Sequence, residues 1–242
     1  MKIYTEKTYE AISSRAASIL KAQLVLKTNS VLGLATGTSP IGTYDKLVED
    51  YHSGEISFKD VRTVNLDEYV GLEDTDPNSY HYFMDAHLFS KIDIEKENTH
   101  VLSGTASDPE KECRSYERMI RSIGGIDMQL LGLGRNGHIG FNEPDEAFTV
   151  DTHIVDLTES TIEANARLFN DISEVPKQAL SMGIGTIMRA KRILLIAYGE
   201  SKADALAKVI AGPVTPHVPG SILQLHPDVT IVCDEAALSK LK

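Results

Sequence analysis

The sequence predicts an α/β protein with a doubly wound, mainly parallel sheet and helices on both faces, a Rossmann-like architecture. Short apolar runs recur along the chain, and stretches with helical periodicity separate them. Strands that are apolar on both faces are typical of parallel sheets that helices cover on both sides. No internal repeat and no linker rich in Gly, Ser or Pro interrupts the 242 residues. We therefore expect a single domain over residues 1–242.

The expected elements alternate along the chain. A helix opens it, and the apolar face of this helix consists of Ile12, Ala16, Ile19 and Leu20. Another helix begins at Asp108, because Asp can cap free N–H groups, Pro109 suits the first helical position and Glu110 complements the helix dipole. The other expected elements are strands at 31–35, 61–66, 128–133, 193–198 and 229–233, helices at 41–51 and 201–211, and a short helix at the C-terminus.

Composition and charge exclude several classes of protein. With 42% hydrophobic and 24% charged residues, the chain has an ordinary globular composition. The net charge is −11 and no basic run is present, so we expect neither nucleic acid nor a membrane surface as a partner. The apolar run at 193–198 is far shorter than the roughly 20 residues of a membrane-spanning helix. Because no secretory signal is visible at the N-terminus, we expect a cytoplasmic protein.

The chain contains two cysteines, Cys113 and Cys233, which lie far apart in the sequence. They form neither a disulfide framework nor a zinc-binding pattern. We expect both to be small buried side chains in a reducing compartment.

In doubly wound folds, ligands bind where the strands end. The first such segment is Thr36, Gly37, Thr38, Ser39 and Pro40. Its backbone N–H groups, its hydroxyls and the following helix start suit a phosphate group. It is not a Walker A loop, because no Gly-Lys-Ser/Thr follows. The alternative is an ordinary turn in which Ser39 caps the helix.

The second segment, 65–69, carries Asp67 and Glu68 at the end of a strand. Side chains alternate along a strand, so we expect only one of the two carboxylates to face a site. The acidic residues between Asp67 and Asp76 lack the spacing of an EF-hand, and we expect no metal ion there. The alternative is a solvated acidic loop.

The third segment, 132–144, contains a GxGxxG pattern after a strand. The dinucleotide fingerprint requires a helix after its last glycine, and the residues that follow here lack helical periodicity, so we reject nucleotide binding. The loop presents Asn136, His138 and Glu143. A histidine beside a carboxylate and an amide is a candidate general acid and base, because the carboxylate can orient and tune the imidazole.

Two cations complete the candidate site. Arg167 lies on an expected helix, and Lys202 begins the helix after 199–201. Most single cations are solvated surface charges, but an acidic chain that binds an anion needs a few placed cations. Arginine offers a bidentate fork for phosphate, and lysine offers a point charge.

Together these segments resemble the glucosamine-6-phosphate deaminase family. The resemblance extends over essentially the whole chain and is carried by the stretches 34–40, 65–72, 132–144, 164–167 and 223–227. It implies an enzyme that converts glucosamine 6-phosphate and water to fructose 6-phosphate and ammonia, with a small-molecule sugar phosphate as its partner and no metal ion or organic cofactor.

The resemblance also implies residue roles. Asp67 matches the carboxylate that takes the C2 proton and returns one at C1. His138 matches the group that opens the pyranose ring, with Asn136 and Glu143 as its supports. The positions matching the phosphate contacts are Thr36, Gly37, Thr38, Ser39, Arg167 and Lys202.

This chain departs from the family pattern at several points. Asn136 stands where many members carry Asp, so it should orient rather than relay a proton. Thr38 stands where a second glycine is common. Members with an allosteric N-acetylglucosamine 6-phosphate site have a longer C-terminal region, so we expect no such activation here. A loop that covers the sugar is expected within 144–175, which look irregular.

Two other functions stay open at this point. One is a lactone hydrolase resembling 6-phosphogluconolactonase, which has a related fold and a similar Gly-His loop. The other is a non-catalytic sugar-phosphate sensor, although this chain has no basic face for a DNA-binding module. The sequence leaves the oligomeric state, monomer or homo-oligomer, undecided.

Overall fold

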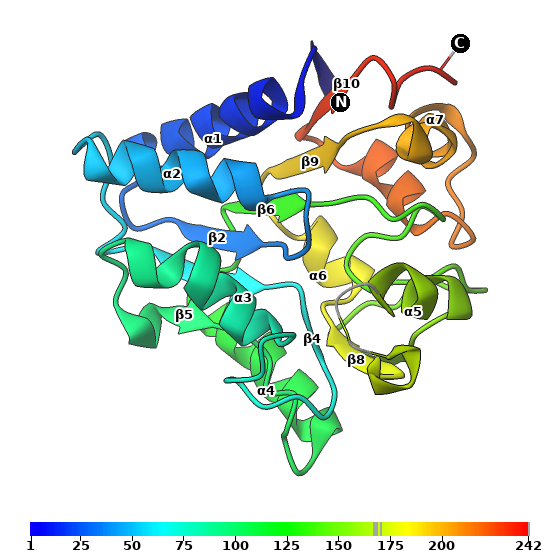
Figure 1. Cartoon of the computed structure of the whole chain (residues 1–242), viewed down its shortest axis with the longest axis horizontal. Coiled ribbons are helices and arrows are strands. Elements are labelled where there is room, and N and C mark those ends of the chain that lie inside the picture. The colour runs from blue at the N-terminus through cyan, green and yellow to red at the C-terminus, as the bar shows by residue number, and fades with distance from the viewer. Residues whose placement is uncertain (167–168, 170, 242) are drawn as a thin grey trace.

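The computed structural model describes residues 1–166, 169 and 171–241 (Figure 1). In these residues the main sheet has seven strands, and all neighbouring strands are parallel. The strand order is β1 (Lys2–Glu6), β10 (Val229–Asp234), β9 (Ile193–Ala197), β6 (Met128–Leu131), β2 (Val31–Leu34), β3 (Arg62–Asn65) and β5 (Thr99–His100). This arrangement confirms the predicted α/β class with a mainly parallel sheet.

Helices surround the main sheet, and α1 and α2 pack side by side (Figure 1). The α-helices are α1 (Tyr9–Leu26), α2 (Ile41–His52), α3 (Tyr80–His87), α4 (Pro109–Ser122), α5 (Glu159–Asn165), α6 (Ile184–Met188) and α7 (Ala203–Ala211). The 3-10 turns are η1 (Phe89–Lys91), η2 (Lys96–Asn98), η4 (Ile172–Glu174), η5 (Glu200–Lys202) and η6 (Pro219–Leu225). Within the described residues, no helix combines the length and the apolar character needed to cross a membrane.

The core forms where the sequence predicts it. Every residue of β2, β6 and β9 is buried, as expected for central strands that are covered on both faces. The predicted face of the first helix also packs inward: Ile12, Ala16 and Leu20 are buried, and Ile19 packs against them partly exposed. Cys113 and Cys233 are free and buried, which confirms their expected role as small core side chains.

A second, antiparallel sheet was not predicted. It has the order β4 (Asp67–Tyr69), β8 (Gln178–Ser181) and β7 (His153–Asp156), and it lies beside α5 (Figure 1). The strand expected at 61–66 ends at Asn65, and the chain then leaves the main sheet, so that Asp67 pairs with Ser181. The strands of this sheet are short, and their pairing is between distant parts of the chain, which local patterns do not reveal.

Other differences have local causes. The segment 144–175 is more regular than expected, because it contains β7 and α5. The prediction of a short C-terminal helix is wrong. Residues 235–240 form turns, with hydrogen bonds such as that from Leu238 N to Asp234 O. A segment this short gains too little from helix propagation to offset nucleation. The edge strand β1 and helix α3 were missed; β1 is mostly exposed and has no apolar run.

Asp127 joins the starts of two central strands. Its buried carboxylate accepts hydrogen bonds from Val31 N at 2.8 Å, Lys27 Nζ at 2.6 Å and Lys191 Nζ at 2.8 Å. Burial alone would raise the pKa of Asp127, but the hydrogen bonds from Lys191 and Lys27 lower it below the ordinary 3.8. The ionised carboxylate therefore stabilises the fold above pH 3.8, and this stabilisation is lost as the pH falls below that value.

Replacing Asp127 by Ala should lower the free energy of unfolding by about 2–4 kcal/mol, because it leaves a buried N–H and two cations without their acceptor. Urea denaturation at neutral pH measures this loss. Asp228→Ala is the matched control: the Asp228 side chain is 39% exposed, and its ion pairs should contribute about 0–1 kcal/mol. Equal losses in the two variants would contradict the role of Asp127.

Candidate active site

Four loops follow four neighbouring strands of the main sheet. The strands are β9, β6, β2 and β3, and because they are parallel their carboxyl ends lie at one edge. The loop 36–40 follows β2, Asp67 follows β3, the loop 132–144 follows β6, and 198–202 follow β9. The predicted site residues on these loops therefore share one edge of the sheet, the usual place for a ligand in such folds.

Asp67 lies where the main sheet meets the second sheet. A Cβ atom built on Gly140 would lie 3.6 Å from Asp67 Oδ2 and 3.1 Å from Ser181 Oγ, so the loop after β6 passes directly beside this carboxylate. Gly140 has a φ of +59°, a conformation that glycine adopts readily. Since Gly140 is two residues beyond His138, the geometry brings together the two segments that carry the predicted acid and base.

The Asp67 carboxylate is 6% exposed and accepts no hydrogen bond from the residues that the structure describes. Burial raises its pKa to about 8, and the nearby charge of Glu68 contributes in the same direction. A carboxyl group in this setting holds its proton more tightly than a solvated one, and once ionised it is a stronger base.

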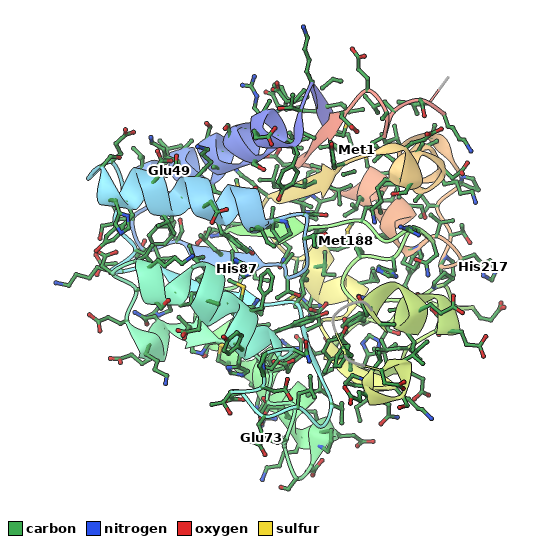
Figure 2. The ribbon with its side chains drawn as sticks, viewed as in Figure 1. Met1, Glu49, Glu73, His87, Met188 and His217 are labelled. Atoms are coloured by element: carbon green, nitrogen blue, oxygen red, sulfur yellow. The ribbon has the colours of Figure 1, made fainter. Side chains whose placement is uncertain are left out.

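Glu68 has a different role from its neighbour. Its buried carboxylate accepts hydrogen bonds from the backbone N–H groups of Tyr80, at 2.9 Å, and His81, at 3.0 Å, at the start of α3. The two adjacent carboxylates thus have separate surroundings, in line with the predicted alternation. Of the later acidic residues of this stretch, Glu73 and Asp74 are exposed, and Glu73 lies far out on the loop after β4 (Figure 2).

His138 and Glu143 form a hydrogen-bonded pair within one loop. His138 Nδ1 lies 3.2 Å from Glu143 Oε2, and Asn136 Nδ2 donates to the same oxygen at 2.6 Å. The Asn136 side chain also accepts from His138 N at 3.2 Å. With Nδ1 bound to the carboxylate, Nε2 of the imidazole is the atom that can exchange a proton with a substrate.

The glycine pattern in this loop makes room for the imidazole. A Cβ atom on Gly134 would lie 2.3 Å from His138 Cδ2, so a side chain at position 134 would overlap the ring. Gly134 N donates to His138 O at 2.9 Å and closes the loop. No helix begins between Gly137 and β7, in agreement with the lack of helical periodicity after the last glycine of the GxGxxG pattern.

Glu143 is also held by residues outside its own loop that the sequence did not indicate. Its other oxygen accepts hydrogen bonds from Thr161, in α5, and from Thr158 at 3.3 Å. Burial alone would raise the pKa of Glu143, but the hydrogen bond and charge of His138, with the hydrogen bonds of Thr161 and Asn136, lower it to about 2. Glu143 is therefore ionised at neutral pH and can stabilise a protonated His138.

The loop 36–39 offers unpaired backbone donors. The N–H groups of Gly37, Thr38 and Ser39 have no partner among the described residues, and Gly37 has a φ of +87°. The alternative in which Ser39 caps α2 is wrong, because the cap residue is Pro40 and no side chain caps this helix. Thr36, at the start of the loop, lies near the Tyr80 hydroxyl.

Lys202 lies at the end of η5, beside a cation that sequence reasoning did not single out. Burial lowers the pKa of Lys202, and the nearby positive charge of Arg135 lowers it further. Neither residue forms an ion pair with the part of the chain that the structure describes. Arg135 precedes Asn136 in the loop after β6, next to β9, so strand order was the signal that could have found it. The predicted residue Arg167 lies outside the described residues.

The described residues contain no group of three or more His, Cys, Asp or Glu that could hold a metal ion.

The fold and this edge of the sheet define a Rossmann-like α/β protein with acid–base groups at its strand ends and backbone N–H donors that have no partner among the described residues. A model of the family described as glucosamine-6-phosphate isomerases/6-phosphogluconolactonase matches residues 4–232. The chain belongs to this family.

Two relatives match the chain along nearly its whole length. The glucosamine-6-phosphate deaminase of Lachnoclostridium phytofermentans is 59% identical over 233 residues, which cover 96% of this chain and 99% of the relative. That of Clostridioides difficile is 54% identical over 241 residues, 100% of this chain and 97% of the relative.

Solved structures agree with this family. A monomeric glucosamine-6-phosphate deaminase superposes with a TM-score of 0.97 at 48% identity, over 99% of this chain and 100% of that one. The 6-phosphogluconolactonase of Trypanosoma brucei superposes with a TM-score of 0.81 at 16% identity, over 100% of this chain and 98% of that one. The second likeness concerns the fold alone.

Proposed function

We propose that this protein is a glucosamine-6-phosphate deaminase, which converts glucosamine 6-phosphate and water to fructose 6-phosphate and ammonia. One observation carries the proposal: the buried Asp67 carboxylate, which has no hydrogen-bond partner among the described residues, lies against the loop that bears the His138–Glu143 pair. The reaction needs one group for ring opening and one base for the C1–C2 bond. The full-length similarity to enzymes of this name supports the same conclusion.

His138 opens the pyranose ring in this proposal. Ring opening moves a proton between O1 and O5, and an imidazole can both give and take a proton. The ionised Glu143 stabilises the protonated imidazole, and Asn136 orients the pair by its hydrogen bonds to both partners. Asn136 has no carboxyl proton and does not relay one.

Asp67 then acts on the open-chain sugar. Its carboxylate takes the proton from C2 while O1 gains one, and it then returns a proton to C1 while the nitrogen loses one, which leaves an imine at C2. Water adds to this C2 imine, and ammonia leaves to give the ketone of fructose 6-phosphate. One base suffices because C1 and C2 are adjacent atoms. No metal ion or organic cofactor takes part in this proposal.

The phosphate group anchors the substrate at the opposite end. We assign it to the loop Thr36, Gly37, Thr38 and Ser39, with Lys202 and Arg167 as its cations. To these we add Arg135, which shares the neighbourhood of Lys202. The positive charges of Lys202 and Arg135 would then lie against the phosphate dianion. The bound phosphate fixes the sugar over Asp67 and His138.

A lactone hydrolase is the second candidate, since family members of that kind share the fold. Lactone hydrolysis has no C2 deprotonation, so it gives no role to an unpaired buried carboxylate at Asp67. Ammonia release from a panel of hexosamine 6-phosphates, assayed with EDTA beside lactone hydrolysis, separates the two. Lactone hydrolysis without ammonia release would reject the proposal.

We further propose a cytoplasmic location, where phosphorylated sugars are found and the two buried thiols stay reduced. The solved relative with the high TM-score is monomeric, and we propose the same state for this chain.

The rate constant kcat/KM should rise as the pH increases toward about 8, because Asp67 must lose its proton before it can act as a base. Asp67→Asn should lower kcat about 10³-fold and change KM much less, since the lost interaction belongs to the transition state. Steady-state kinetics from pH 6 to 9.5 measure both effects.

The matched control for Asp67→Asn is Asp74→Asn, whose side chain is 61% exposed in the same acidic stretch and should leave kcat unchanged. Near-normal turnover in Asp67→Asn would reject the assignment of the base.

Arg135→Ala should raise KM for glucosamine 6-phosphate about tenfold or more, with little change in kcat, because a charged hydrogen bond to the phosphate is lost in ground state and transition state alike. Arg118→Ala, which removes the same charge from the exposed side of α4, should leave KM unchanged. A KM that is equal in both variants would place Arg135 outside the site.

N-acetylglucosamine 6-phosphate should not activate the enzyme. A cavity of about 330 Å³ is lined in part by the end of the loop after β6. Its charged lining residues, Glu143, Asp145 and Asp156, are carboxylates that disfavour an anionic effector. Rate against substrate should be hyperbolic with and without this compound. A sigmoidal curve that the compound makes hyperbolic would contradict the prediction.

A further inference from the structure

The loop 36–39 is held by a side chain from a distant element. The hydroxyl group of Tyr9, the first residue of α1, donates to the carbonyl oxygens of Thr38, at 2.9 Å, and Ser39, at 3.2 Å. The same hydroxyl accepts a hydrogen bond from Gly42 N at 2.9 Å. A tyrosine hydroxyl has one proton to share and lone pairs that accept. Tyr9 thus connects α1 with the loop and with the first turn of α2.

The hydrogen bond from Tyr9 to the Thr38 carbonyl fixes the direction of the Ser39 N–H, because both groups belong to one peptide unit. The described peptide bonds include no cis bond. In a planar trans peptide unit, the C=O and the following N–H point in opposite directions. Because the Thr38 carbonyl is turned toward Tyr9, the Ser39 N–H points away from Tyr9. This N–H has no partner among the described residues, so it is available to an anion.

Few other contacts hold the loop. At its start, Thr36 lies near the Tyr80 hydroxyl. At its end, the helix α2 begins without a side-chain cap. The carbonyl oxygens of Thr38 and Ser39 are held by their hydrogen bonds from the Tyr9 hydroxyl. Without this hydroxyl the carbonyls would hydrogen-bond to water, and the direction of the Ser39 N–H would no longer be fixed.

The ring of Tyr9 also contacts Tyr198, in the segment 198–202 that carries Lys202. Its centroid lies 5.6 Å from that of Tyr198, with an angle of 56° between the planes. Tyr198 follows β9 directly and precedes Gly199, whose N–H donates to Asp234 at 3.0 Å, and η5 with Lys202 comes next. One side chain therefore braces both segments that flank the proposed phosphate position.

We infer that Tyr9 is a positioning residue for phosphate binding: it acts through the loop 36–39 by fixing the direction of the Ser39 N–H. The identity of the phosphate-bearing substrate rests on the proposed function. The affinity of the loop for inorganic phosphate tests Tyr9 independently of that function.

The test is Tyr9→Phe, which removes the hydroxyl and keeps the ring against Tyr198. The Kd for inorganic phosphate, measured by isothermal titration calorimetry, and KM for glucosamine 6-phosphate should both rise about three- to tenfold, the loss expected for one hydrogen bond. The value of kcat should stay within about twofold of wild type, because Tyr9 does not act on the reacting atoms.

The matched control is Tyr51→Phe in α2, whose hydroxyl has no partner within the described ranges and whose loss should leave Kd and KM unchanged. An unchanged phosphate Kd in Tyr9→Phe would overturn the inference. So would a fall of the melting temperature by more than about 5 °C, because the hydroxyl would then support the whole fold. If the wild type binds phosphate but releases no ammonia, the proposed function fails, while the phosphate Kd still decides the role of Tyr9.

Discussion

The candidate site is built around one constraint, the burial of the Asp67 carboxyl group without a hydrogen-bond partner among the residues that the structure describes. Ionising such a group away from water costs free energy, so the proton stays bound to a higher pH than on a solvated aspartate. The large apolar core, with three fully buried central strands, supplies the stability that tolerates this group. The chain keeps a side chain that does not favour folding, at a position where a strong base is useful.

Two carboxyl groups in the site have opposite pKa shifts. Asp67 accepts no hydrogen bond from the described residues, and its pKa is about 8, whereas Glu143 accepts hydrogen bonds from its own loop and from Thr158 and Thr161, and its pKa is about 2. Near neutral pH one group can therefore exchange a proton while the other remains a fixed negative charge. Active sites often contain two carboxyl groups with different pKa values, one of which exchanges protons while the other provides a fixed charge. The two segments meet because Gly140 lets the loop pass beside Asp67.

Much of the fold was predictable because its strands and helices carry strong local patterns. The run at 193–198 and the capped start at Asp108 both appear in the structure as β9 and α4. The site loops were predictable from the rule that ligands bind at strand ends. The second sheet was not, because Asp67 pairs with Ser181, a residue more than a hundred positions away, and no local period marks it.

The same limit applies within the site. His138, Asn136 and Glu143 are close in sequence, so their interaction could be anticipated. Thr161 and Tyr9 reach the site from other elements, and hydroxyl side chains of this kind are too common in sequences to single out. Strand order brings Arg135 next to Lys202, and order is a property of the folded sheet.

The most direct test of the account is the titration of Asp67 itself. Carbon-13 NMR of protein with labelled aspartate carboxyl groups, compared with Asp67→Asn to assign the resonance, reports the protonation of this side chain in the free enzyme. The account predicts a resonance that titrates near pH 8 and is missing in the variant. An Asp67 resonance that titrates near the ordinary value of about 4 would contradict it.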